Sequence, residues 1–181
     1  MLVKTYSAAV TGLEAITVTI EISMTRGNLR HLSGLADGAV KESYDRIKAA
    51  MENNGYKMPI AELTINMSPA DLKTEGSGYD LPMAIGILAS TNKVEAALLN
   101  QYMLIGELGL DGKLQPVRGV LPVAIRARAE KFKGLIVPRQ NVREAAVVNN
   151  LEVFGMDSLL DVIMFFNGQQ AYEPTIIDTR K

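Results

Sequence analysis

The sequence predicts a single α/β (α+β) domain, and three observations support this fold class. Apolar and polar residues alternate at period two in residues 2–10 and 14–24, which is typical of strands with one buried face. Short apolar runs alternate with helical patterns after residue 60, as expected for a domain that packs helices on a sheet. The chain has 181 residues, 48% of them hydrophobic, which suits one domain at about 100 to 200 residues per domain.

The first elements follow from turn and capping residues. Gly12 separates the two alternating segments, which therefore predict a β-hairpin. Residues 25–38 contain three glycines without a sustained period and are interpreted as a loop. A helix follows, with Asp37 as its N-cap and the Asn54-Gly55 pair as its end. Residues 59–69, between two prolines, predict a strand.

The second half of the chain predicts alternating helices and strands. The expected order is a helix beginning at Asp80, a hairpin turning at Asp111-Gly112, a helix in 119–134, a strand in 134–139, a helix in 141–150, a strand in 151–156 and a helix in 157–168. In the helix of 119–134, Val123, Ile125 and Ala129 are expected to face inward and the cations outward. Residues 169–181 lose the periodicity and are interpreted as a linker.

Composition excludes several classes of protein. The chain has no cysteine and a single histidine, His31, and its acids are scattered, so we expect neither a disulfide framework nor a metal site. It has no signal-like or long apolar segment, so we expect a cytoplasmic protein without membrane contact. The net charge of −1 gives no global reason to expect a polyanionic partner.

The segment LKTEGSGYDLPMAIGIL, residues 72–88, raises the main functional question. It is a glycine-containing loop that runs into a helix, with Glu75 and Asp80 on the two sides of the bend. Such a loop can bind phosphate, carry a nucleophile or serve the structure. Phosphate binding of the P-loop type needs a lysine and a hydroxyl after the last glycine, but Gly78 is followed by Tyr79 and Asp80. The chain alone is therefore not expected to hydrolyse nucleotides.

A nucleophile is the second possibility, because two motifs resemble the Lon-type Ser-Lys peptidase domain. They are EGSGYD, residues 75–80, and GELGLDGKLQPVRGVL, residues 106–121. An ungapped match with that family puts Gly78 in place of the catalytic serine and Leu121 in place of the lysine, so neither nucleophile nor base is present. The alternative is a Lon-like Ser-Lys peptidase with a shifted active site, in which Ser77 pairs with Lys113.

A closer resemblance favours the structural or partner-facing interpretation. GLADGAVKES, NMSPADLKTEGSGYDLPMAIGIL and IGELGLDGKLQPVRGVLP resemble the N-terminal domain of the ComM/YifB family, the magnesium-chelatase-like AAA+ ATPases. The resemblance runs from about residue 6 to residue 166, and Ala36 departs from it where the family usually has proline. The motif-loop residues that it includes are Glu75, Gly76, Tyr79 and Asp80.

This resemblance implies a fold and a set of partners. The fold would be a two-layer arrangement like ribosomal protein S5 domain 2 and the Lon peptidase domain, a ChlI-type N-terminal domain over residues 1–168. Residues 169–181 would lead to an AAA+ ATPase domain that is absent from this chain and holds the ATP and magnesium. The fragment itself would be a non-catalytic accessory domain without cofactors, serving substrate engagement or oligomer assembly. The full-length protein would be a hexameric, helicase-like ATPase acting in DNA branch migration during recombination or transformation.

Two groups of cations are candidates for contact with nucleic acid. One lies in the glycine-rich loop beside His31 and can equally be a solvated loop. The other lies between residues 113 and 128, where Glu130 follows the cations and a solvated helix face is the simpler interpretation. The candidate contacts are Arg26, Arg30, Lys113, Arg118, Arg126 and Arg128. Glu75 and Asp80 can bind a metal, but a solvated loop acid and a helix N-cap are the roles that we expect for them.

Overall fold

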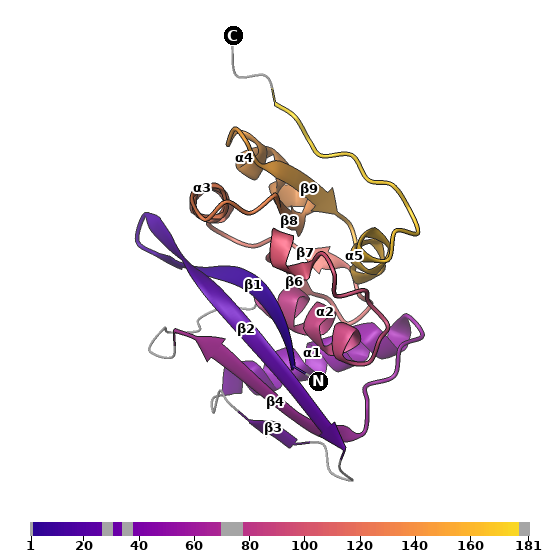
Figure 1. Ribbon diagram of the computed structural model, residues 1–181. Coiled ribbons are helices and arrows are strands. Elements are labelled where there is room, and N and C mark those ends of the chain that lie inside the picture. The colour runs from indigo at the N-terminus through magenta and orange to yellow at the C-terminus, as the bar shows by residue number, and fades with distance from the viewer. Residues whose placement is uncertain (1, 27–30, 34–37, 70–77, 178–181) are drawn as a thin grey trace.

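The predicted N-terminal hairpin forms the longest pair of strands in the computed structural model, which describes residues 2–26, 31–33, 38–69 and 78–177, with the backbone alone for 26, 31–33 and 38–41 (Figure 1). Strand β1 (Leu2–Thr11) pairs antiparallel with β2 (Glu14–Arg26) over the whole length of β1. Strand β4 (Ala61–Ser68), also predicted, pairs antiparallel with β2, and every second residue of β4 is buried.

The loop interpretation of residues 25–38 is wrong in part. Strand β3 (His31–Ser33) lies within this segment and pairs parallel with β4, giving the sheet order β1-β2-β4-β3. Three residues are too few to show a period-two pattern, so this edge strand could not be predicted from alternation. Asp37, the expected N-cap of the first helix, lies outside the described residues.

Two helices pack beside this mixed sheet, in which β3 is parallel to β4 and the other neighbouring strands are antiparallel. Helix α2 (Asp80–Ser90) packs on β1 and β2, and α1 (Gly38–Asn53) packs on α2. Helix α2 is buried along its length except for the last residue. Gly86 brings it close to the sheet, because a side chain there would meet Ile22 of β2. A helix apolar on all sides is typical of a buried position, and α2 therefore forms the centre of the first core.

The second half of the chain builds a parallel sheet with helices on both faces. Its order is β5-β8-β9, formed by β5 (Tyr102–Leu104), β8 (Gly134–Pro138) and β9 (Glu152–Met156). Side chains from one face join the core that includes α2 and α5 (Leu159–Phe166), whereas those from the other face pack against α3 (Val120–Ala129) and α4 (Val142–Ala146). The predicted mixed α/β class is confirmed.

A small hairpin lies between these two halves. Strands β6 (Glu107–Leu108) and β7 (Leu114–Gln115) flank the predicted Asp111-Gly112 turn. Asn54 at the end of α1 donates its side-chain amide to the Asp111 carbonyl, and Leu159 N of α5 donates to the Gly112 carbonyl. The hairpin is therefore fastened to α1 and to α5.

The predicted inner face of α3 is wrong in two of three positions. Val123 is buried, but Ile125 is 46% exposed and Ala129 is exposed. The residues that face inward are Val120, Val123, Ala124 and Ala127. Apolar residues occur on nearly every side of this helix, so their spacing could not identify the buried face.

The segment after α5 lies along the domain as far as it is described. Tyr172 Oη donates a hydrogen bond of 2.9 Å to Asp161 of α5, and Thr175 N donates one of 2.8 Å to the Val153 carbonyl of β9. Burial and the contact with Asp161 raise the pKa of Tyr172 to about 12. The beginning of the predicted linker is thus held against β9 and α5.

Candidate functional site

The two segments that carry the motifs are hydrogen-bonded to each other. Gly106 N donates to the Gly78 carbonyl at 2.9 Å, and Leu81 N donates to the Gly106 carbonyl at 3.0 Å. These bonds join the start of α2 to the segment just before β6. The loop that raised the functional question therefore ends in a fixed backbone contact.

Asp80 connects three elements at this point. Its carboxylate is 0% exposed and accepts hydrogen bonds from Arg46 Nε (2.8 Å to Oδ2), Arg46 Nη2 (3.1 Å to Oδ1) and Leu108 N (3.0 Å to Oδ2). Arg46 Nη2 also donates to Ser43 Oγ at 3.1 Å. We name Asp80, Arg46, Ser43 and Leu108 the Asp80 cluster; it links α1, α2 and β6.

Burial and pairing act in opposite directions on the charge of Asp80. Burial raises the pKa of Asp80, and the hydrogen bonds from Arg46, Leu108 and Ser43 offset part of that rise. The hydrogen bond to Asp80 raises the pKa of Arg46 despite its partial burial. A buried carboxylate is tolerated when it is paired and hydrogen-bonded, and the Asp80 cluster meets that condition.

The geometry limits the chemistry of this site. Both oxygens of Asp80 are engaged in hydrogen bonds inside the protein, and the side chain has no exposed surface. A general base must reach the proton that it removes from a substrate. Asp80 does not meet that requirement in this arrangement. Its contacts instead hold α1, α2 and β6 together.

The expected N-cap role of Asp80 is wrong. Tyr79 occupies the N-cap position without a side-chain cap, and Asp80 is the first helical residue, with its side chain turned to Arg46. The sequence analysis missed Arg46, which lies 34 residues earlier on another helix. No spacing in the sequence links the two residues, because Arg46 reaches Asp80 only through the packing of α1 on α2.

The described positions from the peptidase match carry small or apolar residues. A Cβ atom at Gly78 would lie 3.2 Å from Ile105 Cγ1, and Leu121 packs, partly buried, on the core beneath α3. Glu75, Gly76 and Ser77 lie outside the described residues. Lys113, the suggested partner of Ser77, is exposed in the hairpin turn.

The candidate nucleic-acid contacts that the structure describes lie on different elements and differ in exposure. Arg30 and the side chain of Arg26 lie outside the described residues. Arg126 donates to Thr17 Oγ1 of β2 at 3.1 Å and to Glu130 Oε1 at 2.8 Å, so its guanidinium lies against the N-terminal hairpin. The exposed side chains belong to Lys113 in the β6–β7 turn, Arg118 before α3 and Arg128 on α3.

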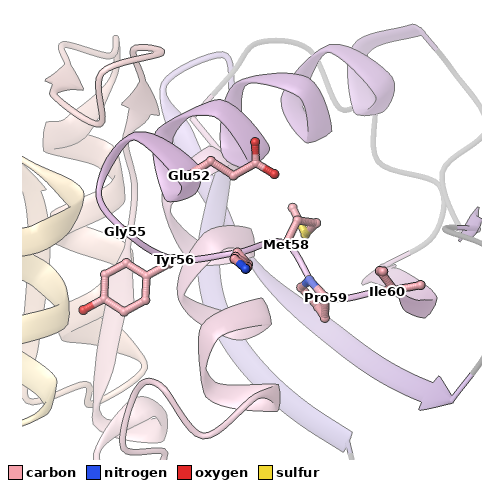
Figure 2. A pocket seen from close by; sticks show the side chains of 7 residues that line it. Glu52, Gly55, Tyr56, Met58, Pro59 and Ile60 are labelled. Carbon is pink, nitrogen blue, oxygen red and sulfur yellow. The ribbon is translucent and has the colours of Figure 1, made fainter.

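A pocket lies elsewhere, at the end of α1, and the sequence analysis did not identify it. Its volume is about 640 Å³, and Figure 2 shows residues of the connection to β4 along it, with Glu52 of α1 at one side. The lining is mainly apolar. Ile60, one of the lining residues, is 68% exposed to solvent. The lining residues are Glu52, Gly55, Tyr56, Lys57, Met58, Pro59 and Ile60. None of them belongs to the Asp80 cluster.

Two further properties concern the described parts of the chain. They contain no group of three or more histidine, aspartate or glutamate side chains placed to hold a metal ion. Within the same ranges no helix is long and apolar enough to cross a membrane.

Comparison with known proteins gives both distant and more similar relatives. A family model described as subunit ChlI of Mg-chelatase matches residues 20–141. The chain is 41% identical over 166 residues to competence protein ComM of Haemophilus influenzae, covering 91% of this chain and 32% of ComM. It is 37% identical over 170 residues to the uncharacterized protein YifB of Escherichia coli, covering 93% of the chain and 33% of YifB. Lon protease 2 of Bacillus subtilis is 23% identical over 124 residues, 68% of this chain and 22% of that protein. The chain thus spans about a third of the length of ComM and YifB.

Proposed function

This chain belongs to the family of the magnesium-chelatase subunit ChlI, and from that premise we propose that it is a non-catalytic domain of a longer protein of the ComM and YifB type. Its role is to engage the substrate of that protein or to assemble its oligomer. The chain spans about a third of those relatives. ATP and magnesium act in the remaining part of the longer protein, which forms a homo-oligomer and works on DNA during recombination or transformation.

This proposal rests on the Asp80 carboxylate, because both of its oxygens accept hydrogen bonds from groups inside the protein. The motif loop resembles one that holds a nucleophile in a peptidase, yet its buried acid is used in three hydrogen bonds that fasten α1, α2 and β6. Gly78 contributes no nucleophile and Leu121 no base. The absence of these groups at residues 78 and 121, together with the internal hydrogen bonds of Asp80, supports a structural role.

Nucleic-acid contact is a second candidate, favoured by the exposure of Lys113, Arg118 and Arg128. Exposed cations can contact phosphates with little desolvation, and such contacts supply affinity without sequence preference. Arg126 is less available because it is paired with Glu130. In this second candidate the domain guides DNA toward the ATP-driven part of the protein.

Deleting residues 1–168 from the full-length gene product tests the accessory role. We expect the truncated protein to keep ATP hydrolysis at saturating ATP and to lose oligomer assembly or DNA-dependent stimulation of that hydrolysis. Light scattering and a DNA titration would measure the last two properties. Loss of ATP hydrolysis in a truncated protein that still assembles would contradict an accessory role, as would full retention of all three properties.

A further inference from the structure

The turn of the N-terminal hairpin carries the most exposed large apolar side chain in the described part of the chain. Leu13 is 94% exposed, and Val10 beside it is 41% exposed. A Cβ atom at Gly12 would meet no described atom within 4 Å, and Figure 1 shows this turn projecting from the sheet. We name residues 10–14 the hairpin tip. Burying an apolar side chain of this size is favourable, so the hairpin tip has the form of a knob that a pocket can take up.

The pocket at the end of α1 lies at the opposite end of strand β2. Its residue Ile60 directly precedes Ala61, which pairs with Arg26, the last residue of β2. The hairpin tip instead includes Glu14, the first residue of β2. The 13 residues of β2 span about 40 Å, at roughly 3.3 Å per residue. The hairpin tip therefore cannot enter the pocket of its own molecule.

The lining of this pocket suits an apolar side chain of a protein better than a small molecule. Sites for small molecules usually add converging polar groups that fix the orientation of the ligand. The two charged residues of the lining, Glu52 and Lys57, are instead both exposed. The cavity of about 640 Å³ is otherwise lined by Gly55 and by the larger residues Tyr56, Met58, Pro59 and Ile60.

The polar groups of the hairpin tip complement those of the pocket. Glu14 is exposed directly after Leu13, and Lys57 is exposed at the pocket. A leucine side chain seated in the pocket would bring Glu14 within reach of Lys57. The exposed Thr11 hydroxyl can donate a hydrogen bond to Glu52, the acid of the lining. Opposite charges around an apolar contact fix its register and disfavour other partners.

We propose that copies of this domain assemble head to tail, with the hairpin tip of one copy seated in the pocket of the next copy. Leu13 is the buried anchor, and Glu14 pairs with Lys57 of the next copy. Two different surfaces meet in such a contact, so the assembly closes into a ring or extends as a filament. This inference rests on the proposed function, because it names the surfaces through which the domain assembles the oligomer.

Disulfide trapping tests this contact, because the chain has no cysteine of its own. Leu13→Cys and Ile60→Cys are made in separate proteins, mixed and oxidised, and the cross-linked dimer is measured by non-reducing electrophoresis. Leu13→Cys mixed with Ile176→Cys is the matched control, since Ile176 is 86% exposed in the segment held to β9. Docking raises the effective concentration of the two thiols, so we expect the first mixture to cross-link at least about tenfold faster than the control.

Charge reversal provides a second measurement that needs no thiol. Lys57→Glu and Glu14→Lys should each weaken self-association of the chain in sedimentation velocity, because each places like charges at the contact. Combining both substitutions in one chain should restore self-association, since the charges are then opposite again. Lys133→Glu, at an exposed lysine before β8, is the control and should leave self-association unchanged.

Five results would overturn the inference. Equal cross-linking of Leu13→Cys with either partner cysteine would exclude docking in the pocket. Rapid cross-linking of Leu13→Cys with itself would identify a symmetric contact between two hairpin tips. Protection of Leu13→Cys from a maleimide by duplex DNA, without cross-linking to Ile60→Cys, would identify nucleic acid as the occupant. Self-association that neither charge reversal changes would place the interface elsewhere and leave the proposed assembly role standing. A chain that stays monomeric at every concentration would contradict that role as well.

Discussion

Arg46 and Asp80 form a two-point ion pair, with the Arg46 Nε atom 2.8 Å from Asp80 Oδ2 and the Nη2 atom 3.1 Å from Oδ1. The pair joins α1 to the first residue of α2, next to the loop that resembles a peptidase site. Paired guanidinium and carboxylate groups fix geometry more strictly than a single contact does. The position of Asp80, where the motif segment enters α2, therefore depends on a residue outside both motifs.

Replacing Arg46 with Met should destabilise the protein strongly. Met keeps much of the apolar stem but leaves the Asp80 carboxylate, which is 0% exposed, without its charged partner. Removing one member of a buried pair costs about 3 to 5 kcal/mol. Because Arg46 is itself 22% exposed, we expect a loss in unfolding free energy near the lower end, about 3 kcal/mol, measured by urea unfolding.

Arg139→Met is the control for that substitution. Arg139 pairs with Asp157 at 2.8 Å, but the two side chains are 60% and 63% exposed. Exposed pairs contribute less than about 1 kcal/mol. Equal losses for Arg46→Met and Arg139→Met would contradict a special role for the Asp80 cluster.

The titration of Asp80 should contribute to the pH dependence of the unfolding free energy. Burial raises the pKa of Asp80 above its ordinary value of 3.8. The Asp80 carboxylate is therefore protonated at a higher pH in the native state than in the unfolded state. The resulting stabilisation is fully present below the unfolded pKa and is lost as pH rises through the folded pKa. Compared with Asp80→Asn, the wild type should therefore gain unfolding free energy as pH falls from neutral toward the unfolded pKa. A relative gain with rising pH would mean that pairing with Arg46 outweighs burial.

The N-terminal hairpin should depend on a close approach at Gly119. Gly119 precedes α3 with a φ of +81°, and a Cβ atom there would lie 2.8 Å from Val10 Cγ2 of β1. Gly12 in the hairpin turn has a φ of +65° but nothing within 4 Å. Alanine at either position carries the cost of a left-handed backbone, about 1 kcal/mol. Overpacking should make Gly119→Ala worse than Gly12→Ala by at least about 1 kcal/mol in urea unfolding; equal losses would argue against this contact.

The salt dependence of nucleic-acid binding should show which of the described cations contact phosphates. In a salt series with a labelled four-way junction and with single strands, log affinity should fall linearly with log salt concentration. Combining Lys113→Ala with Arg118→Ala should lower the slope by about two, and Arg126→Ala should change it less because Arg126 is paired with Glu130. Absence of binding at low salt would remove nucleic acid from the proposed roles of this domain.

Local patterns predicted much of the fold because they depend on neighbouring residues. The hairpin around Gly12 and the strand of Ala61–Ser68 follow from alternation and turn residues. Strand β3 and the buried face of α3 were missed for opposite reasons. The strand is too short to show a period, and the helix is too uniformly apolar to show a direction.

The candidate site required information that the sequence does not carry locally. Hydrogen bonds join Gly78 and Asp80 of the first motif to Gly106 and Leu108 of the second, a contact that the sequence analysis did not predict. The partner of Asp80 comes from a distant helix, and its selection depends on how α1 packs against α2. No spacing rule brings Arg46 to Asp80, so a helix cap was the simpler expectation for an acid at that position.

Peptide hydrolysis by the 181-residue chain tests the central claim most directly, namely that the motif loop is structural and carries no catalysis. Wild type and Ser77→Ala should both release fluorescent peptides from labelled casein no faster than a buffer control. Hydrolysis by the wild type that Ser77→Ala abolishes would contradict the claim and would support a shifted serine active site.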